Sequence, residues 1–129
     1  MTRSDDPEFE TPFEEGRALF NEGRFFECHE VWEHLWMETG DDRAHLLKGL
    51  LQAAIAIHHF RRSNFEGARK LFEGQKRILA PFRPESQQLA LAEFDQAMDL
   101  LFEPLLRARP GERPEFRAER VPKLLRGGP

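Results

Sequence analysis

The sequence is poor in the features that define several large classes of protein. Among its 129 residues there is one cysteine, Cys28, so no intrachain disulfide can form, and the composition fits a reducing cytoplasm. No apolar run follows the amino terminus, which argues against a signal peptide. The longest apolar stretch, 46–60, is too short and too polar to span a bilayer. We therefore expect a cytoplasmic protein without a membrane segment.

The chain also lacks a clustered basic surface. Its formal net charge is −4, and acidic and basic residues are mixed along most of its length. The densest basic stretch, 61–77, is interrupted by Glu66 and Glu73, which is typical of a solvated helix face. A nucleic-acid-binding protein needs a continuous positive patch, so we expect no nucleic-acid partner.

The length predicts one domain with two unpatterned ends. Residues 1–10 are acidic and show no periodicity, so we expect a disordered N-terminal tail. Residues 108–129 are rich in proline, arginine and glycine and predict an extended C-terminal tail, part of which Val121, Leu124 and Leu125 could dock on the body. Between them, 11–107 should form a single helical domain, and the 12 phenylalanines of the chain should fill much of its core.

Hydrophobic periodicity and helix-end signals predict an all-α fold. Thr11 and Glu14 read as a capping box for the first helix, and Pro104 should kink or end the last one. Short loops make successive helices antiparallel neighbours, so we expect a compact bundle of about five antiparallel helices arranged as helical hairpins. The predicted helices span about 11–21, 25–39, 42–62, 65–79 and 89–102.

A weak internal repeat relates two parts of this pattern. At an offset of 40 residues, Phe25 matches Phe65 and Trp32 matches Phe72. Each copy reads as helix, tight turn, helix, which resembles the layout of tetratricopeptide-type hairpins, although their period is about 34 residues. We interpret the repeat as shared packing logic and not as membership of that class.

The stretch 25–39 holds polar residues that its helical pattern does not explain. Its apolar residues fall on one broad arc, whereas His29 and Glu33 lie one turn apart at the edge of that arc. A polar group placed there needs a partner, because burying it unpaired costs roughly 1–3 kcal/mol. Folding this helix back on the next brings His29 level with Gln52 and puts His59 one to two turns beyond. Two polar rows are therefore expected to face each other inside the bundle.

One interpretation of these rows is a divalent-metal site in the bundle core. His29 and Glu33 at i, i+4 can chelate one ion, and His59 is the best third ligand. This ligand set suits Zn or Fe, and a metal-activated water would make the protein a hydrolase, with Glu30 or Glu33 as base. Whether the protein is an enzyme stays open. The residues expected to orient the ion or contact a ligand are Gln52, Trp36 and Glu30.

Two other interpretations of the same residues stay open. In one, His29, Glu33 and Gln52 form a buried network with a water and only fix the helix register, so the protein is a helical-hairpin interaction module. In the other, the residues line a metal-free pocket for a small ligand. The partner would then be a small molecule or a protein of unknown identity, and a homo-oligomer is a further option.

A longer string of residues carries a resemblance to a known family. It runs Phe20-Asn21-x-Gly23-x-Phe25-Phe26-Glu27-x-His29-Glu30-x-x-Glu33-x-x-Trp36, followed by Gly49-Leu50-Leu51-Gln52, His59 and Asn64-x-x-Gly67-Ala68. Over about residues 13–80 the chain resembles the all-helical domain-of-unknown-function family 309, known by a His-x-x-x-Glu-x-x-Trp motif. The resemblance implies the helical fold and a suggested metal-binding role for the motif, and it implies no reaction. Ser63 stands where that family usually has glycine, and Cys28 where alanine is common.

Overall fold

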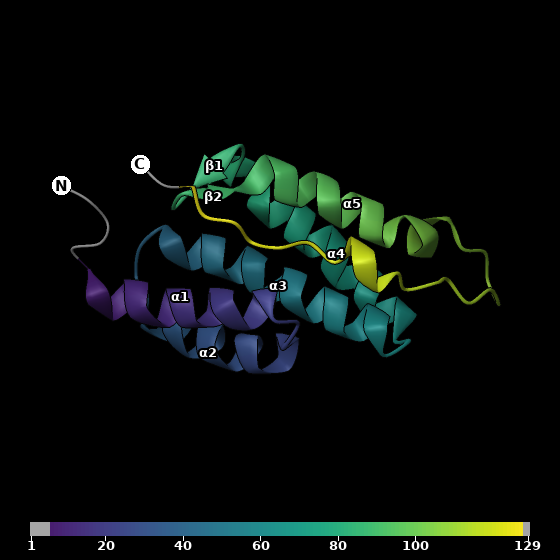
Figure 1. The fold of residues 1–129 in the computed structure, drawn as a ribbon, viewed down its shortest axis with the longest axis horizontal. Helices are drawn as coiled ribbons and strands as arrows, with labels where there is room; N and C mark the ends of the chain where they lie inside the picture. Colours follow the sequence, from purple (N-terminus) through teal and green to yellow (C-terminus); the bar gives the residue numbers. More distant parts are fainter. Residues whose placement is uncertain (1–5, 128–129) are drawn as a thin grey trace.

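The computed structural model describes residues 6–127, and helices account for most of them (Figure 1). The helices and strands are α1 (Pro7–Asn21), α2 (Phe25–Glu38), α3 (Arg43–Arg61), α4 (Phe65–Leu79), β1 (Glu85–Ser86), β2 (Leu89–Ala90) and α5 (Leu91–Arg107). Two short turns of 3-10 helix, η2 (Ala80–Phe82) and η3 (Ala118–Arg120), complete the regular structure. This arrangement confirms the predicted all-α bundle of antiparallel helices.

The first four helices form two hairpins that close with the same turn. In the α1–α2 hairpin the turn residue is Gly23, with φ +81°, and in the α3–α4 hairpin it is Ser63, with φ +66°. The N–H of Gly23 donates to the carbonyl of Phe20 (2.9 Å), and the N–H of Ser63 donates to that of Phe60 (3.0 Å). Both are the left-handed helix ending that favours glycine. The internal repeat is therefore a repeated backbone geometry, with a non-glycine residue in its second copy.

Helix α3 lies at the centre of the bundle, as its nearly all-round apolar sequence predicts. It packs against both α2 and α4. Helix α4 approaches closely because Gly49 leaves room for Leu79, whose side chain lies 2.5 Å from where a Cβ at position 49 would be. On another side Phe60 contacts Phe102 of α5, with 5.2 Å between ring centroids. None of the helices in the described residues is long and apolar enough to cross a membrane.

Trp32 determines how α2 sits on α1. Its side chain is fully buried, and its indole N–H donates to the carbonyl of Phe13 (3.1 Å). The indole lies against Gly16, where any Cβ would overlap the ring. With the ring in this slot, Cys28 and Leu35 also point inward and are buried. The opposite face of α2 is left to solvent.

The first helix is longer than its capping signals predict. We expected it to begin at Thr11, but α1 begins at Pro7, and Phe9 is buried. The tail that we expected to be disordered over 1–10 is thus helical from Pro7 onward, while 1–5 lie outside the described residues. Burial of an aromatic ring stabilises this extra turn, and capping signals alone do not reveal such a long-range contact.

Helix α5 continues through Pro104, which we expected to kink or end it, and runs past the predicted end at Phe102. A proline inside a helix leaves the carbonyl four residues earlier without its usual N–H partner. That carbonyl belongs to Leu100, and Nη1 of Arg120 donates to it (3.1 Å). The C-terminal segment therefore supplies the missing hydrogen bond, and the helix runs on to Arg107.

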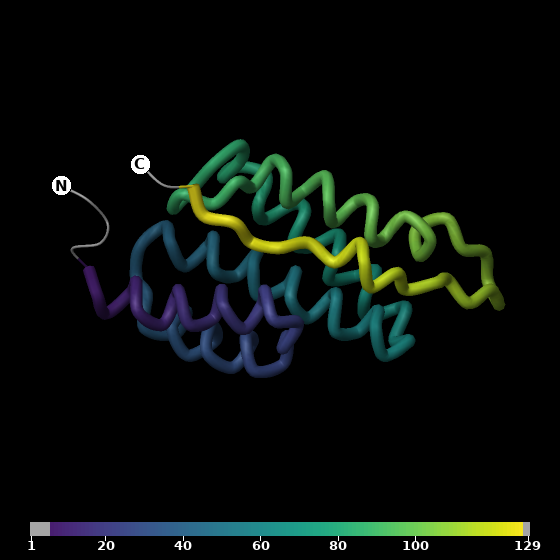
Figure 2. The backbone as a smooth tube through the Cα atoms, in the orientation of Figure 1, coloured from purple at the N-terminus to yellow at the C-terminus, as the bar shows by residue number. Residues whose placement is uncertain are grey.

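The C-terminal segment is extended for most of its length and returns along the bundle (Figure 2). We call residues 121–127 the C-terminal strap. Leu124 is buried, its N–H donates to Oδ1 of Asn21 (2.7 Å), and its carbonyl accepts from Nη1 of Arg17 (2.6 Å). The docking expected at Leu124 is confirmed, whereas Leu125 is 65% exposed.

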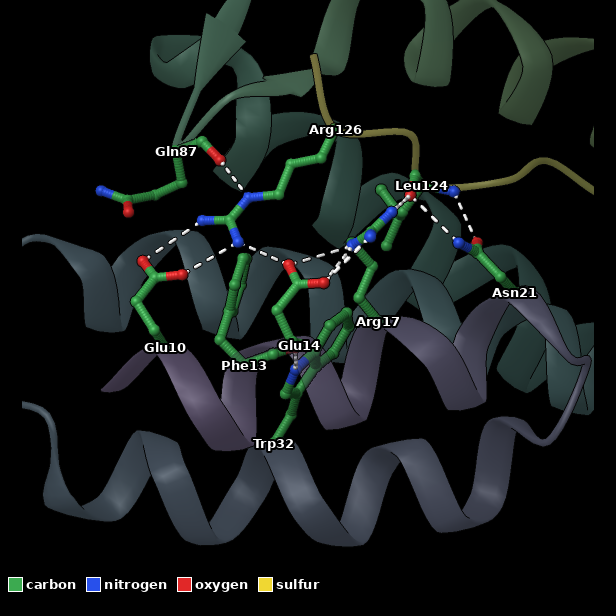
Figure 3. A network of polar contacts seen from close by, with 9 residues as sticks. All are labelled: Glu10, Phe13, Glu14, Arg17, Asn21, Trp32, Gln87, Leu124 and Arg126. Atoms are coloured by element: carbon green, nitrogen blue, oxygen red, sulfur yellow. Dashed lines mark hydrogen bonds and ion pairs between the residues drawn. The ribbon is translucent and has the colours of Figure 1, made fainter. Parts of the chain in front are cut away.

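Arg126 ties the strap to α1 and to the β1–β2 turn (Figure 3). Its guanidinium pairs with Glu14 and, at 2.9 Å, with Glu10, and its Nε donates to the carbonyl of Gln87 (2.9 Å). The same group lies over the ring of Phe13, 5.1 Å from the centroid. Burial by itself raises the pKa of Glu14, but hydrogen bonds and positive charge from the neighbouring arginines outweigh it, so this pKa lies below the ordinary value of 4.5.

We predict that the two hairpin turns respond in opposite directions to substitution. Ser63→Gly removes a side chain from a left-handed backbone and should raise the free energy of unfolding by about 0.5–1 kcal/mol, after the extra freedom of glycine in the unfolded chain is counted. Gly23→Ser should lower it by about 1 kcal/mol. Chemical denaturation measures both changes, and a loss of stability in Ser63→Gly would contradict the shared turn.

We also predict that acid weakens the attachment of the strap. A carboxyl group whose pKa is lowered by folding stabilises the folded state above its ordinary pKa of 4.5, and this contribution is lost as pH falls through the lowered pKa. The free energy of unfolding should therefore fall less steeply with acid in Arg126→Gln than in the wild type. Denaturation in urea at a series of pH values measures the slopes. Arg107→Gln, which removes only an exposed pair with Glu103, is the control and should keep the wild-type slope.

Candidate functional site

The His-x-x-x-Glu-x-x-Trp motif lies on the outer face of α2. Positions three and four apart lie close together round a helix, and the motif residues occupy a strip about 40–100° round α2 from the inward Trp32, at the border of the buried side. The exposed fractions are 30% for the His29 side chain, 54% for that of Glu33 and 37% for Trp36. The expectation that these residues lie in the bundle core is therefore corrected. They lie at the surface, because the core-facing side of α2 is already filled.

His29 and Glu33 make a loose contact. Nε2 of His29 lies 3.9 Å from Oε2 of Glu33, which is beyond hydrogen-bond distance. Helix α2 carries a second pair of the same kind, in which Nε2 of His34 lies 3.4 Å from Oε2 of Glu38 on a more exposed face. Exposed pairs with this spacing contribute about 0.2–0.5 kcal/mol. Stability alone therefore gives little reason for the motif.

A small open hollow lies beside His29, between α2 and α4. It encloses about 140 Å³ and is lined by His29, by Leu71 of α4, and by Leu51, Gln52 and Ile55 of α3. His29 and Gln52 thus lie level with each other, as the antiparallel register predicts. The volume is well below the roughly 300–1,000 Å³ of pockets for drug-sized ligands. It suits a few waters or one inserted side chain.

The row of polar residues on α3 that includes Gln52 and His59 does not open into a buried cavity in the described part of the chain. The side-chain amide of Gln52 lies against Gly74 of α4, where a Cβ would overlap Oε1. The space beside Gly49 is filled by the side chain of Leu79. Because helix–helix packing uses this space, the hollow beside His29 is what remains of the expected site.

The structure brings two of the three predicted metal ligands together. His29 and Glu33 are neighbours, whereas Nδ1 of His59 lies 3.3 Å from Nδ2 of Asn64, the residue that caps α4. Between residues 6 and 127, no three or more His, Cys, Asp or Glu side chains form a group that could hold a metal ion. A metal held by His29, Glu33 and His59 stays a prediction.

His58, which the sequence pattern does not single out, packs beside the motif. Its ring lies 6.1 Å from the ring of Phe26, centroid to centroid, and its Nδ1 is buried without a hydrogen-bond partner in the described part of the chain. Burial, followed by the positive charges of Arg61 and Arg62, lowers the pKa of His58 below its ordinary 6.5. The imidazole is therefore neutral at pH 7 and adds an aromatic surface next to Phe26.

Exposed apolar side chains gather on the same side of α2. Phe26, Trp36 and Met37 are 54%, 37% and 71% exposed. In the described residues they are half of the six large apolar residues with such exposure, the others being Leu100, Leu106 and Leu125. An apolar cluster of this kind marks a contact surface more often than a scattered residue does. We call the following residues the α2 stripe: Phe26, His29, Glu33, Trp36 and Met37.

Sequence reasoning placed Phe26 only at the edge of the apolar face and did not single out Met37. Aromatic and sulfur-containing side chains on an amphipathic helix usually belong to the core, so one that faces solvent is easily taken for a core residue. A signal was available in the helical geometry. Once Trp32 is taken as the inward residue, positions 26 and 37 lie about 120° and 140° round the helix from it.

The fold and the motif together define an all-helical domain of two hairpins whose motif faces outward. Residues 13–71, from α1 to α4, match the family model described as "Domain of unknown function (DUF309)". This part of the chain is therefore similar to the DUF309 family, and the resemblance predicted from the motif is confirmed. Helix α5 and the C-terminal strap lie outside the match.

A curated relative matches part of the chain. The "Uncharacterized protein YpuF" of Bacillus subtilis (strain 168) is 41% identical to the chain over 56 residues. The alignment covers 43% of this chain and 32% of the relative. The chain thus spans about a third of the length of the curated relative it matches.

Proposed function

We propose that this protein is a binding module that receives a helical protein segment on the α2 stripe. The observation that supports the proposal is the exposure of Phe26, Trp36 and Met37 beside the His29–Glu33 pair. Aromatic residues and methionine are enriched where proteins contact one another. Leaving three such side chains in water forgoes burial worth roughly 1.5–3 kcal/mol each, and a bound partner would recover part of it.

The surface next to the stripe supports a helix as the ligand. The hollow between α2 and α4 shows Ile55 and Leu71 to solvent and continues the apolar surface beyond His29. Its volume of about 140 Å³ fits one side chain, so a residue of a docked helix could enter it. Helix-in-groove recognition uses apolar residues at i, i+3 or i+4, and i+7 in this way.

The chemistry around the stripe favours binding over catalysis. Cys28 is fully buried, and burial raises the pKa of its thiol, so it is not an activated nucleophile. The His29 and Glu33 side chains are 30% and 54% exposed and lie 3.9 Å apart. A general acid or base works best when it is held by a hydrogen bond, and this pair lies beyond hydrogen-bond distance.

Selection from a library of amphipathic helical peptides tests the proposal. We expect the full chain to enrich peptides with apolar residues at i, i+3 or i+4, and i+7, because these spacings present one apolar stripe. Trp36→Asp should raise their dissociation constant by about tenfold or more. Peptide binding should also shift the fluorescence of Trp36, since the other tryptophan, Trp32, is buried.

Leu100→Asp is the matched control for this selection. It removes a side chain of α5 that is 50% exposed and lies outside the stripe, so peptide affinity should not change. A library that enriches no helix, or peptides that bind Trp36→Asp as well as the wild type, would argue against a binding function of the stripe.

A divalent cation at the motif is a second candidate. It is supported by the 3.9 Å between Nε2 of His29 and Oε2 of Glu33, because an ion could bind both atoms and complete its shell with water. Zn or Fe suits such ligands. Neither proposal includes catalysis.

Elemental analysis of protein purified without added metal tests the second candidate. We expect a near-equimolar metal that is lost in His29→Ala. His34→Ala disturbs the other i, i+4 pair of α2 and should keep the metal. Traces of metal that are the same in both variants would count against a cation at the motif.

A further inference from the structure

The α2 stripe has the same spacing when it is read from either end. Phe26, His29, Glu33 and Trp36 are separated by three, four and three positions, so their midpoint falls at position 31. An aromatic ring stands at each end, and one imidazole and one carboxylate stand on either side of the midpoint. Such a stripe is complementary to an antiparallel copy of itself, because each ring meets a ring and each imidazole meets a carboxylate.

We propose that a second copy of this chain occupies the α2 stripe, with the two α2 helices antiparallel about a two-fold axis near position 31. This inference rests on the proposed function, because it names the helix that the stripe receives. His29 of each copy then faces Glu33 of the other, and Phe26 faces Trp36. The contact is closed and self-complementary, as two-fold dimer interfaces are.

The charges favour the antiparallel orientation over the parallel one. In a parallel pair with the same register, His29 would face His29 and Glu33 would face Glu33, which brings like groups together. The antiparallel pair brings opposite groups together, and juxtaposed like charges are what suppresses wrong pairings at interfaces. Glu30 lies about 60° round the helix from Glu33. Glu30 is therefore on the flank of the contact, where solvent screens its repulsion by Glu30 of the second copy.

The ends of the stripe supply the apolar contact that such a pair needs. Next to Phe26, the neutral ring of His58 widens the aromatic surface. Next to Trp36, Met37 is 71% exposed, and its flexible side chain can adapt to an incoming ring. These groups would flank the two central imidazole–carboxylate pairs and keep water from them, which strengthens the polar contacts.

Helix α2 is placed where a second copy can reach it. It packs against α1 and α3 and forms an outer edge of the bundle (Figure 1). The C-terminal strap docks on the other side of α1, so that α1 lies between the strap and α2 (Figure 3). Among the described residues, the strap therefore does not compete for the stripe.

Exchanging the two charges tests the pairing. His29→Glu places a carboxylate opposite Glu33 of the second copy, and Glu33→Lys places a lysine opposite His29 of the second copy. Each single variant should self-associate at least about tenfold more weakly than the wild type. An equimolar mixture of the two should restore the dimer, because the new acid of one chain then faces the new lysine of the other. The double variant His29→Glu/Glu33→Lys should dimerise like the wild type.

Sedimentation equilibrium of the full chain, with EDTA present, measures these changes. The controls are His34→Glu and Glu38→Lys, which alter a pair with the same spacing on another face of α2 and should leave self-association unchanged. The inference is overturned if the wild type stays monomeric at all concentrations, if mixing restores nothing, or if EDTA dissociates the dimer. Recovery on mixing, with unchanged controls, supports it.

The peptide selection separates the failure of this inference from the failure of the proposed function. If the wild type is monomeric but still enriches helices that depend on Trp36, the stripe binds helices and self-pairing is ruled out. If it neither dimerises nor enriches such helices, both proposals fail. If it dimerises through the stripe, the selected peptides should dissociate the dimer, because they compete for the same surface.

Discussion

The indole of Trp32 occupies a slot on α1 that exists only because residue 16 is glycine. Its N–H is satisfied by the carbonyl of Phe13, so the ring is held by a hydrogen bond as well as by packing. This contact sets the rotation of α2 about its own axis, because a helix that buries one side must present the opposite side to water. His29 and Trp36 lie about 60° and 40° round the helix from Trp32, so the packing of Trp32 leaves them partly exposed at the border of the buried side.

The two hairpins and the C-terminal part of the chain contribute different things. The hairpins, which carry the DUF309 match, repeat one turn geometry at Gly23 and Ser63 and present α2 at an edge. The C-terminal part covers a different side. There, Arg120 satisfies a carbonyl that Pro104 leaves without a partner, and Arg126 joins two carboxylates of α1. Covering one side of the bundle while leaving α2 open is what makes the α2 stripe a candidate contact surface.

Much of the fold could be predicted because its signals are local. The α4 cap at Asn64 and the turn at Gly23 each involve residues only a few positions apart. The prediction was wrong where a distant contact decided the outcome, as with Phe9 at the start of α1 and with Pro104 in α5. At the candidate site, the i, i+4 neighbours His29 and Glu33 and the hollow that His29 shares with Gln52 were within reach of helical geometry. The solvent exposure of these residues could not be predicted, because a residue at the edge of an apolar arc can lie either in the core or in solvent.

Periodicity and residues close together in the chain were enough to predict the helices, their antiparallel hairpins and the spacing of the stripe along α2. Contacts between helices settle that this stripe faces solvent, that His59 pairs with Asn64, and that Leu79 fills the space beside Gly49. The rotation of a helix about its axis, and the filling of the space beside it, depend on which side chains from other helices occupy that limited space. For α2 that choice was made by Trp32 and Gly16, residues that lie on different helices.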